Sequence, residues 1–312
     1  MKNNYKTMFG IAFGTMIVLA STIMPAQAQS PIGNPLAIKP PVGLPVVPIF
    51  EGSYDNADGS VTYSFGYLNR NTDEPLSVPL GQNNRIEPAQ FDGVQPTYFE
   101  TTRHTGVFTV TVPASMRDGE VWWYIKTGTH AETKVPGRRG RMGYTIDTLA
   151  RPSGSLAPLV SYTEGGPTGQ NPMGMTAQDM LSVKAGVPVT LTVHTSDPSA
   201  RDMTDTRNAK GIPLRVSWHK HQGPGAVTYQ QHPSSEDPAP LTELQIRRGG
   251  SLPGPDQTVL TNGGGVANVI ATFAQPGDYV IRTMVDNWEA LDSTEADQCC
   301  WTNVYQKVTV TP

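Results

Sequence analysis

The 312-residue sequence is poor in charged residues. Asp, Glu, Lys and Arg make up 16% of it, whereas Gly (31) and Pro (28) are abundant. Long helices depend on Ala, Leu, Glu and Lys, so this composition argues against a helical protein. It favours short strands joined by many turns, and the length suits two domains.

The sequence also lacks an excess of basic residues, and its formal net charge is −4. Contacts from Lys and Arg to phosphate supply most of the affinity of proteins for nucleic acids. We therefore expect no nucleic-acid partner.

The motifs of common enzyme families are absent as well. The sequence has no G-x-S-x-G, no H-E-x-x-H and no phosphate-binding glycine loop before a helix. Enzymes that work through a pair of carboxylates carry no such signature, so an enzyme stays an alternative to a binding protein.

Long apolar runs are confined to the N-terminus. Lys2 and Lys6 precede the apolar stretch Met8–Leu19, and Ala26-Gln27-Ala28 follows it. A basic segment, a short apolar segment and a small-x-small site predict a signal peptide over residues 1–28. The run is too short to span a bilayer stably, although a retained anchor is the alternative. The mature chain is expected to be secreted or periplasmic, with no transmembrane segment.

Residues 49–149 are predicted to form a first β-sandwich. Large apolar residues alternate with small or polar ones in Val61–Tyr67, and Val107–Pro113 repeats the alternation. Glu120–Thr127 is apolar on both faces, as a central strand would be. Residues 29–48, with six prolines, cannot form a central strand and predict an extended Pro-rich arm.

Residues 185–312 are predicted to form a second sandwich, after a Gly-, Pro- and Met-rich connector at residues 150–184 that shows no sustained periodicity. Trp218 and Tyr279 lie in two of its alternating segments, and we expect both in one core. The predicted fold class is thus all-β, with two Ig-like β-sandwich domains after a signal peptide and a Pro-rich arm.

Four motifs follow one another in residues 185–312: AGVPVTLT, VSWHKHQGPGAV, ATFAQPGDYVIRTMVDN and a terminal KVTV. In this order they resemble the PKD-type, Ig-like β-sandwich modules of exported proteins. The whole chain also resembles a group of uncharacterised exported bacterial proteins. The resemblance implies a non-catalytic module of the cell envelope with a binding or structural role, as a spacer, a surface-display unit or a binder of a polysaccharide or protein partner. We expect no cofactor.

The two cysteines, Cys299 and Cys300, are adjacent. Neighbouring Cα atoms lie about 3.8 Å apart, less than the roughly 4.4–6.8 Å of most disulfides. In an exported protein we predict a vicinal disulfide that stiffens the turn before the last strand. Intermolecular bridging, two separate buried thiols, and a redox or metal role are the alternatives.

His219 and His221 closely follow Trp218. If Trp218 faces the core, the alternation of a strand places both imidazoles on the outer face, roughly 6–7 Å apart. Two imidazoles so placed can share a metal with a third ligand, for which His194 and His232 are candidates.

Three connector methionines, Met173, Met175 and Met180, would suit Cu(I) if the connector folds back onto these histidines. The alternative function is therefore a periplasmic metal-dependent protein of the copper type, either an enzyme or a metal-handling protein. Surface histidines and gap-filling methionines are the alternative reading of the same residues.

Two further surfaces are candidates for binding. Asp286, Asp292 and Asp297 lie in one acidic loop that suits calcium, although the loop lacks the spacing of an EF-hand and a solvated acidic loop is the alternative. Trp122 and Trp123 are consecutive, so at least one of them must face a second layer, the other domain or a ligand. Exposed aromatic rings on a sheet are typical of sugar-binding faces.

Overall fold

The structure is a computed structural model of the chain. It describes residues 42–140, 142–146, 148–206, 208, 211–236, 240–241, 243, 247, 252–293 and 299–312. The predicted signal peptide and most of the Pro-rich arm lie outside these residues, and both stay predictions. Pro40–Pro312 is one compact unit. In the part of the chain that is described, no helix is long and apolar enough to cross a membrane.

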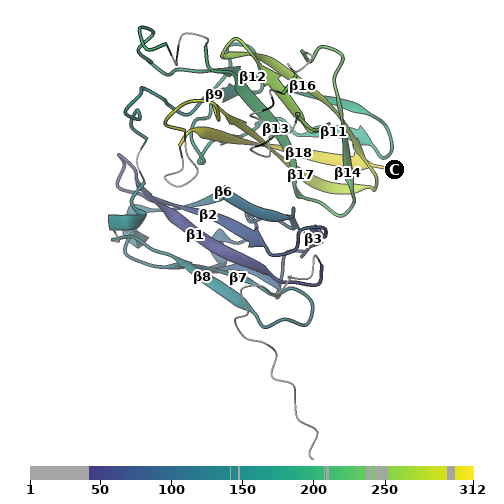
Figure 1. Cartoon of the computed structure of the whole chain (residues 1–312). Coiled ribbons are helices and arrows are strands. Elements are labelled where there is room, and N and C mark those ends of the chain that lie inside the picture. Colours follow the sequence, from purple (N-terminus) through teal and green to yellow (C-terminus); the bar gives the residue numbers. More distant parts are fainter. Residues whose placement is uncertain are drawn as a thin grey trace, which may run out of the picture. The chain divides into compact units, whose positions relative to one another are not determined.

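The first half of the compact unit consists of strands and three single turns of 3-10 helix (Figure 1). The strands are β1 (Val46–Asp55), β2 (Val61–Asn69), β3 (Leu76–Ser77), β4 (Asn84–Glu87), β5 (Tyr98–Phe99), β6 (Thr102–Val112), β7 (Val121–Ile125) and β8 (Thr133–Gly137). The turns of 3-10 helix are η1 (Ala89–Phe91), η2 (Ala114–Met116) and η3 (Met142–Tyr144).

These strands form two antiparallel sheets and a short pair. One sheet has the order β1-β2-β6, the other has the order β4-β7-β8, and β3 pairs with β5. In chain order, the first sheet holds strands A, B and E of an Ig-like sandwich, and the second holds strands C, F and G.

The alternating residues of β2 fill the core of this sandwich. Tyr63, Phe65 and Tyr67 are buried on its inner face, as the period of two predicts. Across the core, Phe108 packs edge-on against Trp123, with ring centroids 4.9 Å apart. Gly137 ends β8 so close to Phe65 that a Cβ there would lie 2.6 Å from the ring.

The second half of the compact unit is also built of strands (Figure 1). They are β9 (Leu159–Ser161), β10 (Met175–Thr176), β11 (Leu181–Lys184), β12 (Val189–Ser196), β13 (Leu214–Gln222), β14 (Val227–Gln231), β15 (Gln257–Leu260), β16 (Gly264–Phe273), β17 (Gly277–Asp286) and β18 (Trp301–Thr311).

Their pairing is that of a second Ig-like sandwich. One sheet has the order β14-β16-β12-β9, which in chain order is D-E-B-A. The facing sheet contains β18-β17-β13, which corresponds to G-F-C, with β15 beside β13 and with β10 and β11 parallel to β18. The all-β fold of two Ig-like sandwiches is therefore confirmed.

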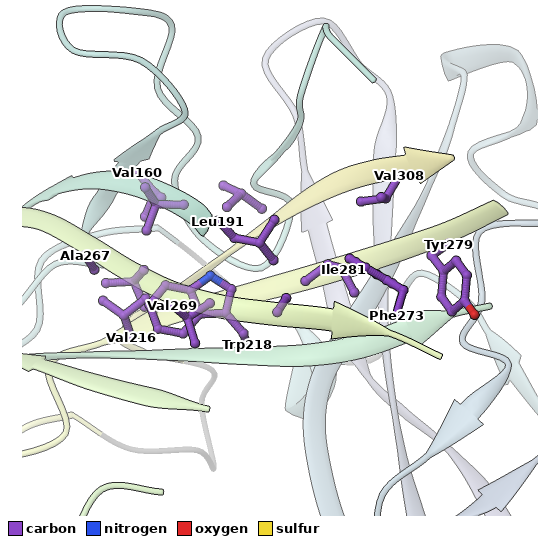
Figure 2. Packing of buried hydrophobic residues seen from close by; sticks show 14 of the residues in the cluster. Val160, Leu191, Val216, Trp218, Ala267, Val269, Phe273, Tyr279, Ile281 and Val308 are labelled. Atoms are coloured by element: carbon purple, nitrogen blue, oxygen red, sulfur yellow. The ribbon is translucent and has the colours of Figure 1, made fainter. Parts of the chain in front are cut away.

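Trp218 and Tyr279 both lie in the core of the second sandwich. Trp218, on strand C, is 1% exposed and packs among Val216, Leu191 and other apolar side chains (Figure 2). Tyr279, near the start of strand F, packs on Phe273 at 5.0 Å, and its hydroxyl donates to the Gln275 carbonyl at 2.9 Å. A tyrosine that bonds back to the chain at this corner is a common feature of Ig-like domains.

The connector contributes strands where its sequence shows no periodicity. β9 pairs with β12, and β10 and β11 add to β18 in parallel. These segments are only two to four residues long. A strand so short is defined by the partner that it joins and not by its own pattern, so the sequence could not reveal it.

The outer face of β13, β17 and β18 meets the first sandwich through hydrogen bonds. The backbone of Thr97 donates to the His221 carbonyl at 2.9 Å, and the Asn303 side-chain amide donates to the Gly106 carbonyl at 2.6 Å. This contact brings residues of β6 beside the outer face of the second sandwich, where the candidate site lies.

Candidate functional site

A pocket of about 350 Å³ lies where β6 meets the outer face of β13 and β17. We call it the Arg–Trp pocket. It is lined by Arg103, His104, Thr105, Arg215, Ser217, His219, Gln257, Arg282, Met284, Asp286, Trp288, Ser293, Cys299 and Trp301. Its lining thus combines guanidinium, imidazole, hydroxyl and amide groups with two indole rings.

Arg215 and Asp286 form one wall of this pocket. The Arg215 Nε and Nη2 atoms each lie 3.0 Å from Asp286 Oδ2. The guanidinium also stacks over the half-buried Trp288 ring, 5.0 Å from its centroid. The Trp288 backbone N–H donates to Asp286 Oδ1 at 3.1 Å, so the loop after β17 holds the ring against this ion pair.

Arg103 reaches the pocket from β6. Its Nη2 donates to both carboxylate oxygens of Glu51 at 2.6 Å, across Gly66 of the intervening strand. A Cβ at Gly66 would overlap the Glu51 carboxylate and the His104 carbonyl. A glycine is therefore needed at this position for the ion pair to cross β2.

Glu100, His104 and His219 form a half-buried cluster beside the pocket. Glu100 Oε2 lies 2.8 Å from His219 Nδ1 and 3.7 Å from His104 Nε2. Burial alone would raise the pKa of Glu100, but His219, His104 and Arg282 outweigh it and lower the pKa to about 2. Burial lowers the pKa of His104 to about 4. Glu100 is therefore ionised and His104 neutral at pH 7.

Arg282 is the most deeply placed cation of the pocket, at 3% exposure. Its Nη1 donates to Asn303 Oδ1 at 3.1 Å. Among the described ion pairs it has no direct carboxylate partner, but its charge contributes to the lowered pKa of Glu100. A buried cation is costly unless it is compensated, and Glu100 provides that compensation at longer range.

Two ring nitrogens of this lining have no hydrogen-bond partner in the part of the chain that the structure describes. Within the described residues, the indole Nε1 of Trp301 and the Nε2 of His219 are buried and make no hydrogen bond. Trp301 is only 5% exposed. Unsatisfied buried polar groups are rare in native proteins, and a bound ligand or water is the usual partner.

The chemistry of the pocket favours a neutral, hydroxyl-rich ligand. Arg103 and Arg215 are neutralised by carboxylates, and Glu100 balances Arg282, so the site has little net charge. Carboxylate, guanidinium and amide groups beside indole rings can bond hydroxyls and stack on C–H faces. The Glu100–His219 contact could orient a general base. In the described part of the chain, no hydroxyl hydrogen-bonds His219 Nε2.

His219 and His221 do lie on one face of β13, but that face meets the first sandwich. His219 bonds Glu100, and His221 Nε2 lies 2.8 Å from the Val94 carbonyl. His194 is on β12, in the opposite sheet. The described residues contain no cluster of three or more His, Cys, Asp or Glu side chains suited to a metal. The expected third ligand of this type is therefore not beside them.

The acidic loop is described only in part. Asp286 accepts from Arg215, and Asp292 Oδ2 accepts the Ser153 backbone N–H at 2.7 Å. Asp297 lies outside the described residues. The calcium site stays a prediction, although these two carboxylates already bind protein donors.

Of the two adjacent tryptophans, only Trp122 reaches the surface. Trp123 is 0% exposed, because it faces the core of the first sandwich, where its Nε1 donates to Asn84 Oδ1 at 3.0 Å. It is not part of a ligand face, and that part of the expectation was wrong. Trp122 lies half-buried on the outer face beside Tyr124, under the Lys134 ammonium at 4.8 Å.

Cys299 and Cys300 form a vicinal disulfide in the structure. Cys300 is fully buried, and Cys299 contributes to the lining of the Arg–Trp pocket. The Cys300 backbone N–H donates to Ser293 Oγ at 3.2 Å. The disulfide therefore lies between the pocket and β18, where it positions Trp301.

Replacing both Cys299 and Cys300 with Ser is expected to change global stability little, by about 1 kcal/mol or less, because closing so short a loop removes little entropy from the unfolded chain. Chemical denaturation measures this change. Hydrogen exchange at the start of β18 should increase, since the constraint on Trp301 is lost. A loss of more than half of the total stability would contradict a local role.

Sequence patterns missed most of this site. Glu100, His104 and Arg103 are separated from Arg215 and Arg282 by more than a hundred residues. One signal was present. Arg282 is the single charged residue of the segment YVIRTMV, and a charge within a largely apolar segment usually has a buried partner.

No protein-family model matches the chain, and no curated protein matches it. Solved structures with similar strand arrangements include a conjugative transposon lipoprotein from Bacteroides eggerthii, which is 12% identical and covers 43% of this chain and 90% of its own, with a TM-score of 0.22. The D00-D0 domain of intimin is 12% identical, covering 86% and 100%, with a TM-score of 0.25. Dpr2 Ig1-Ig2, in complex with DIP-Theta Ig1-Ig3, is 10% identical, covering 85% and 99%, with a TM-score of 0.21. Matches at this level carry no information about function.

Proposed function

We propose that the chain is an exported, non-catalytic binding protein of the cell envelope whose ligand is a saccharide held in the Arg–Trp pocket. The observation that carries the proposal is the half-buried Trp288 ring, fixed beside the Arg215–Asp286 ion pair in a pocket with little net charge. The resemblance of residues 185–312 to PKD-type modules supports a non-catalytic role.

The two unsatisfied groups of the pocket support the same ligand class. Trp301 Nε1 is a donor, and His219, whose Nδ1 contacts Glu100, has no hydrogen-bond partner at Nε2 among the described residues. A hydroxyl both donates and accepts, so a polyol can satisfy both groups without bringing a charge into the pocket. A peptide would need a longer groove for its backbone than a pocket of about 350 Å³.

Trp288→Ala is expected to weaken saccharide binding at least about 30-fold, because a central aromatic contact typically contributes 2 kcal/mol or more. A glycan array screened with the purified protein identifies the ligand, and calorimetric titration measures the change in Kd. Trp288 is half-buried on a loop, so the variant should retain its fold.

Trp122→Ala is the matched control, since it removes a half-buried tryptophan from the outer face of the first sandwich. Its Kd should equal that of the unaltered protein. Loss of binding in Trp122→Ala, with Trp288→Ala unaffected, would move the ligand face to β7. Failure of every glycan to bind would sink the saccharide proposal and favour a protein partner.

A further inference from the structure

A second cavity, of about 320 Å³, lies between β10, β18 and the loop before β5. We call it the Met–His cavity. Its lining includes Met173 and Met175 of the connector together with His221 of β13. Both methionines are half-buried, and His221 is 3% exposed. Two thioethers and one imidazole, which come from segments far apart in the sequence, thus share one cavity.

The hydrogen bond of His221 determines which of its nitrogens is free. A carbonyl can only accept, so the 2.8 Å contact with the Val94 oxygen places the proton on Nε2. Nδ1 then carries a lone pair. This atom is buried and has no hydrogen-bond partner among the residues that the structure describes. Leaving a buried acceptor without a partner is unfavourable, so Nδ1 is suited to bind a ligand in the cavity.

This arrangement of His221 is the one seen in metal-binding histidines. Such residues donate the N–H of one ring nitrogen to a carbonyl or carboxylate, which fixes the tautomer and aims the other nitrogen at the metal. The Tyr305 ring packs against the imidazole, with centroids 5.3 Å apart, and further restricts its orientation.

The methionines are held at the cavity by backbone contacts. Met175 pairs with Val304 in the parallel β10–β18 ladder. Gly174, between the two methionines, has a φ of +49°, and a Cβ there would overlap the Asn303 carbonyl oxygen. Only glycine allows the connector to approach β18 so closely. Met173 and Met175 therefore owe their place to specific packing and not to chance folding of a loose loop.

We propose that His221 Nδ1 and the thioethers of Met173 and Met175 bind one Cu(I) ion in the Met–His cavity. Thioether sulfur is a soft ligand that selects Cu(I) over zinc, magnesium or calcium. The three ligands are neutral and the described lining holds no carboxylate, while the exposed Lys307 adds a positive charge. A monovalent soft cation suits this lining, whereas a divalent hard cation would meet no compensating charge.

Titration of the purified protein with Cu(I) under anaerobic conditions, in competition with bicinchoninate, tests the proposal. It is run in the C299S/C300S background, so that no thiolate can bind the metal. We expect one Cu(I) per chain. M173L/M175L should weaken binding by roughly 100-fold or more, because both soft ligands are lost. Met→Leu conserves volume, so the fold should persist.

Met180→Leu is the matched control, since Met180 is exposed and does not line the cavity. Its Cu(I) affinity should be unchanged. X-ray absorption of the copper-loaded protein should show sulfur and nitrogen neighbours, with sulfur missing in M173L/M175L. Unchanged affinity in M173L/M175L, absence of stoichiometric Cu(I), or a spectrum with nitrogen and oxygen neighbours only would each overturn the proposal.

Discussion

Trp218→Ala is expected to lower the free energy of unfolding by about 3–5 kcal/mol, the typical cost of deleting a fully buried aromatic side chain. Trp218 lies between the two sheets of the second sandwich and contacts strands of both (Figure 2). Its Nε1 makes no hydrogen bond in the described part of the structure, so the cost comes from lost packing and the cavity that remains.

Urea denaturation followed by circular dichroism measures this change. Trp122→Ala, on the outer face of the first sandwich, is the control and should cost about 1 kcal/mol or less. If the two variants had equal unfolding midpoints, Trp218 would not be a determinant of the core.

The contrast between these two tryptophans shows what a strand pattern can predict. The alternation around Trp218 determines its face, and the core position of Trp218 and Tyr279 follows from it. The run Trp122, Trp123 and Tyr124 was harder because all three residues are aromatic. Only the register of β7 with its neighbours places Trp123 inward and the other two outward.

A strand pattern also fails to say what covers an outer face. His219 and His221 share a face, as the alternation implies, yet that face is covered by the first sandwich instead of by water. The pocket and the cavity both lie along this contact. Their residues come together because of the strand order and the contact between the two sandwiches. No local periodicity of the sequence indicates this arrangement.

In the connector, the sequence indicated which residues could bind a metal but not where they lie. Its methionines were recognisable as soft ligands by residue type, but their approach to His221 depends on Gly174 fitting against Asn303. A glycine in a Gly- and Pro-rich stretch gives no sign of such a contact. Residue chemistry was therefore more predictable than residue placement.

The free energy of unfolding is expected to fall steeply as the pH is lowered from 7 to 4. The folded-state pKa is about 4 for His104 and about 3 for His221, both lowered mainly by burial. In the unfolded chain both would titrate near the ordinary value of about 6.5. Between these values the unfolded state binds more protons than the folded state, so acidification favours unfolding.

Protonation linked to each histidine is expected to lower the free energy of unfolding by on the order of 3 kcal/mol between pH 7 and pH 4, since one pKa unit corresponds to about 1.4 kcal/mol. The lowered pKa of Glu100 also makes the protein less stable in acid, mainly at pH values below the ordinary pKa of a glutamate. Burial opposes its charge, yet His219, His104 and Arg282 lower its pKa to about 2, so its contribution is lost as the pH falls from about 4.5 towards 2. The summed loss is comparable with the whole stability of many domains, about 5–15 kcal/mol.

Urea denaturation at pH 7, 5.5 and 4, followed by tryptophan fluorescence, measures this dependence. His104→Gln removes one of the titrating groups, so the difference in unfolding free energy between pH 7 and pH 4 should shrink by about half of the histidine contribution. His232→Gln is the control, because the half-buried His232 hydrogen-bonds to Ser234 in its own loop, so its replacement should leave the difference unchanged. His104, His221 and Glu100 all lie at the contact between the two sandwiches. We therefore expect acid to weaken this contact first. A flat pH profile between 7 and 4 would show that His104 and His221 are hydrated in solution, and would contradict the buried contact itself.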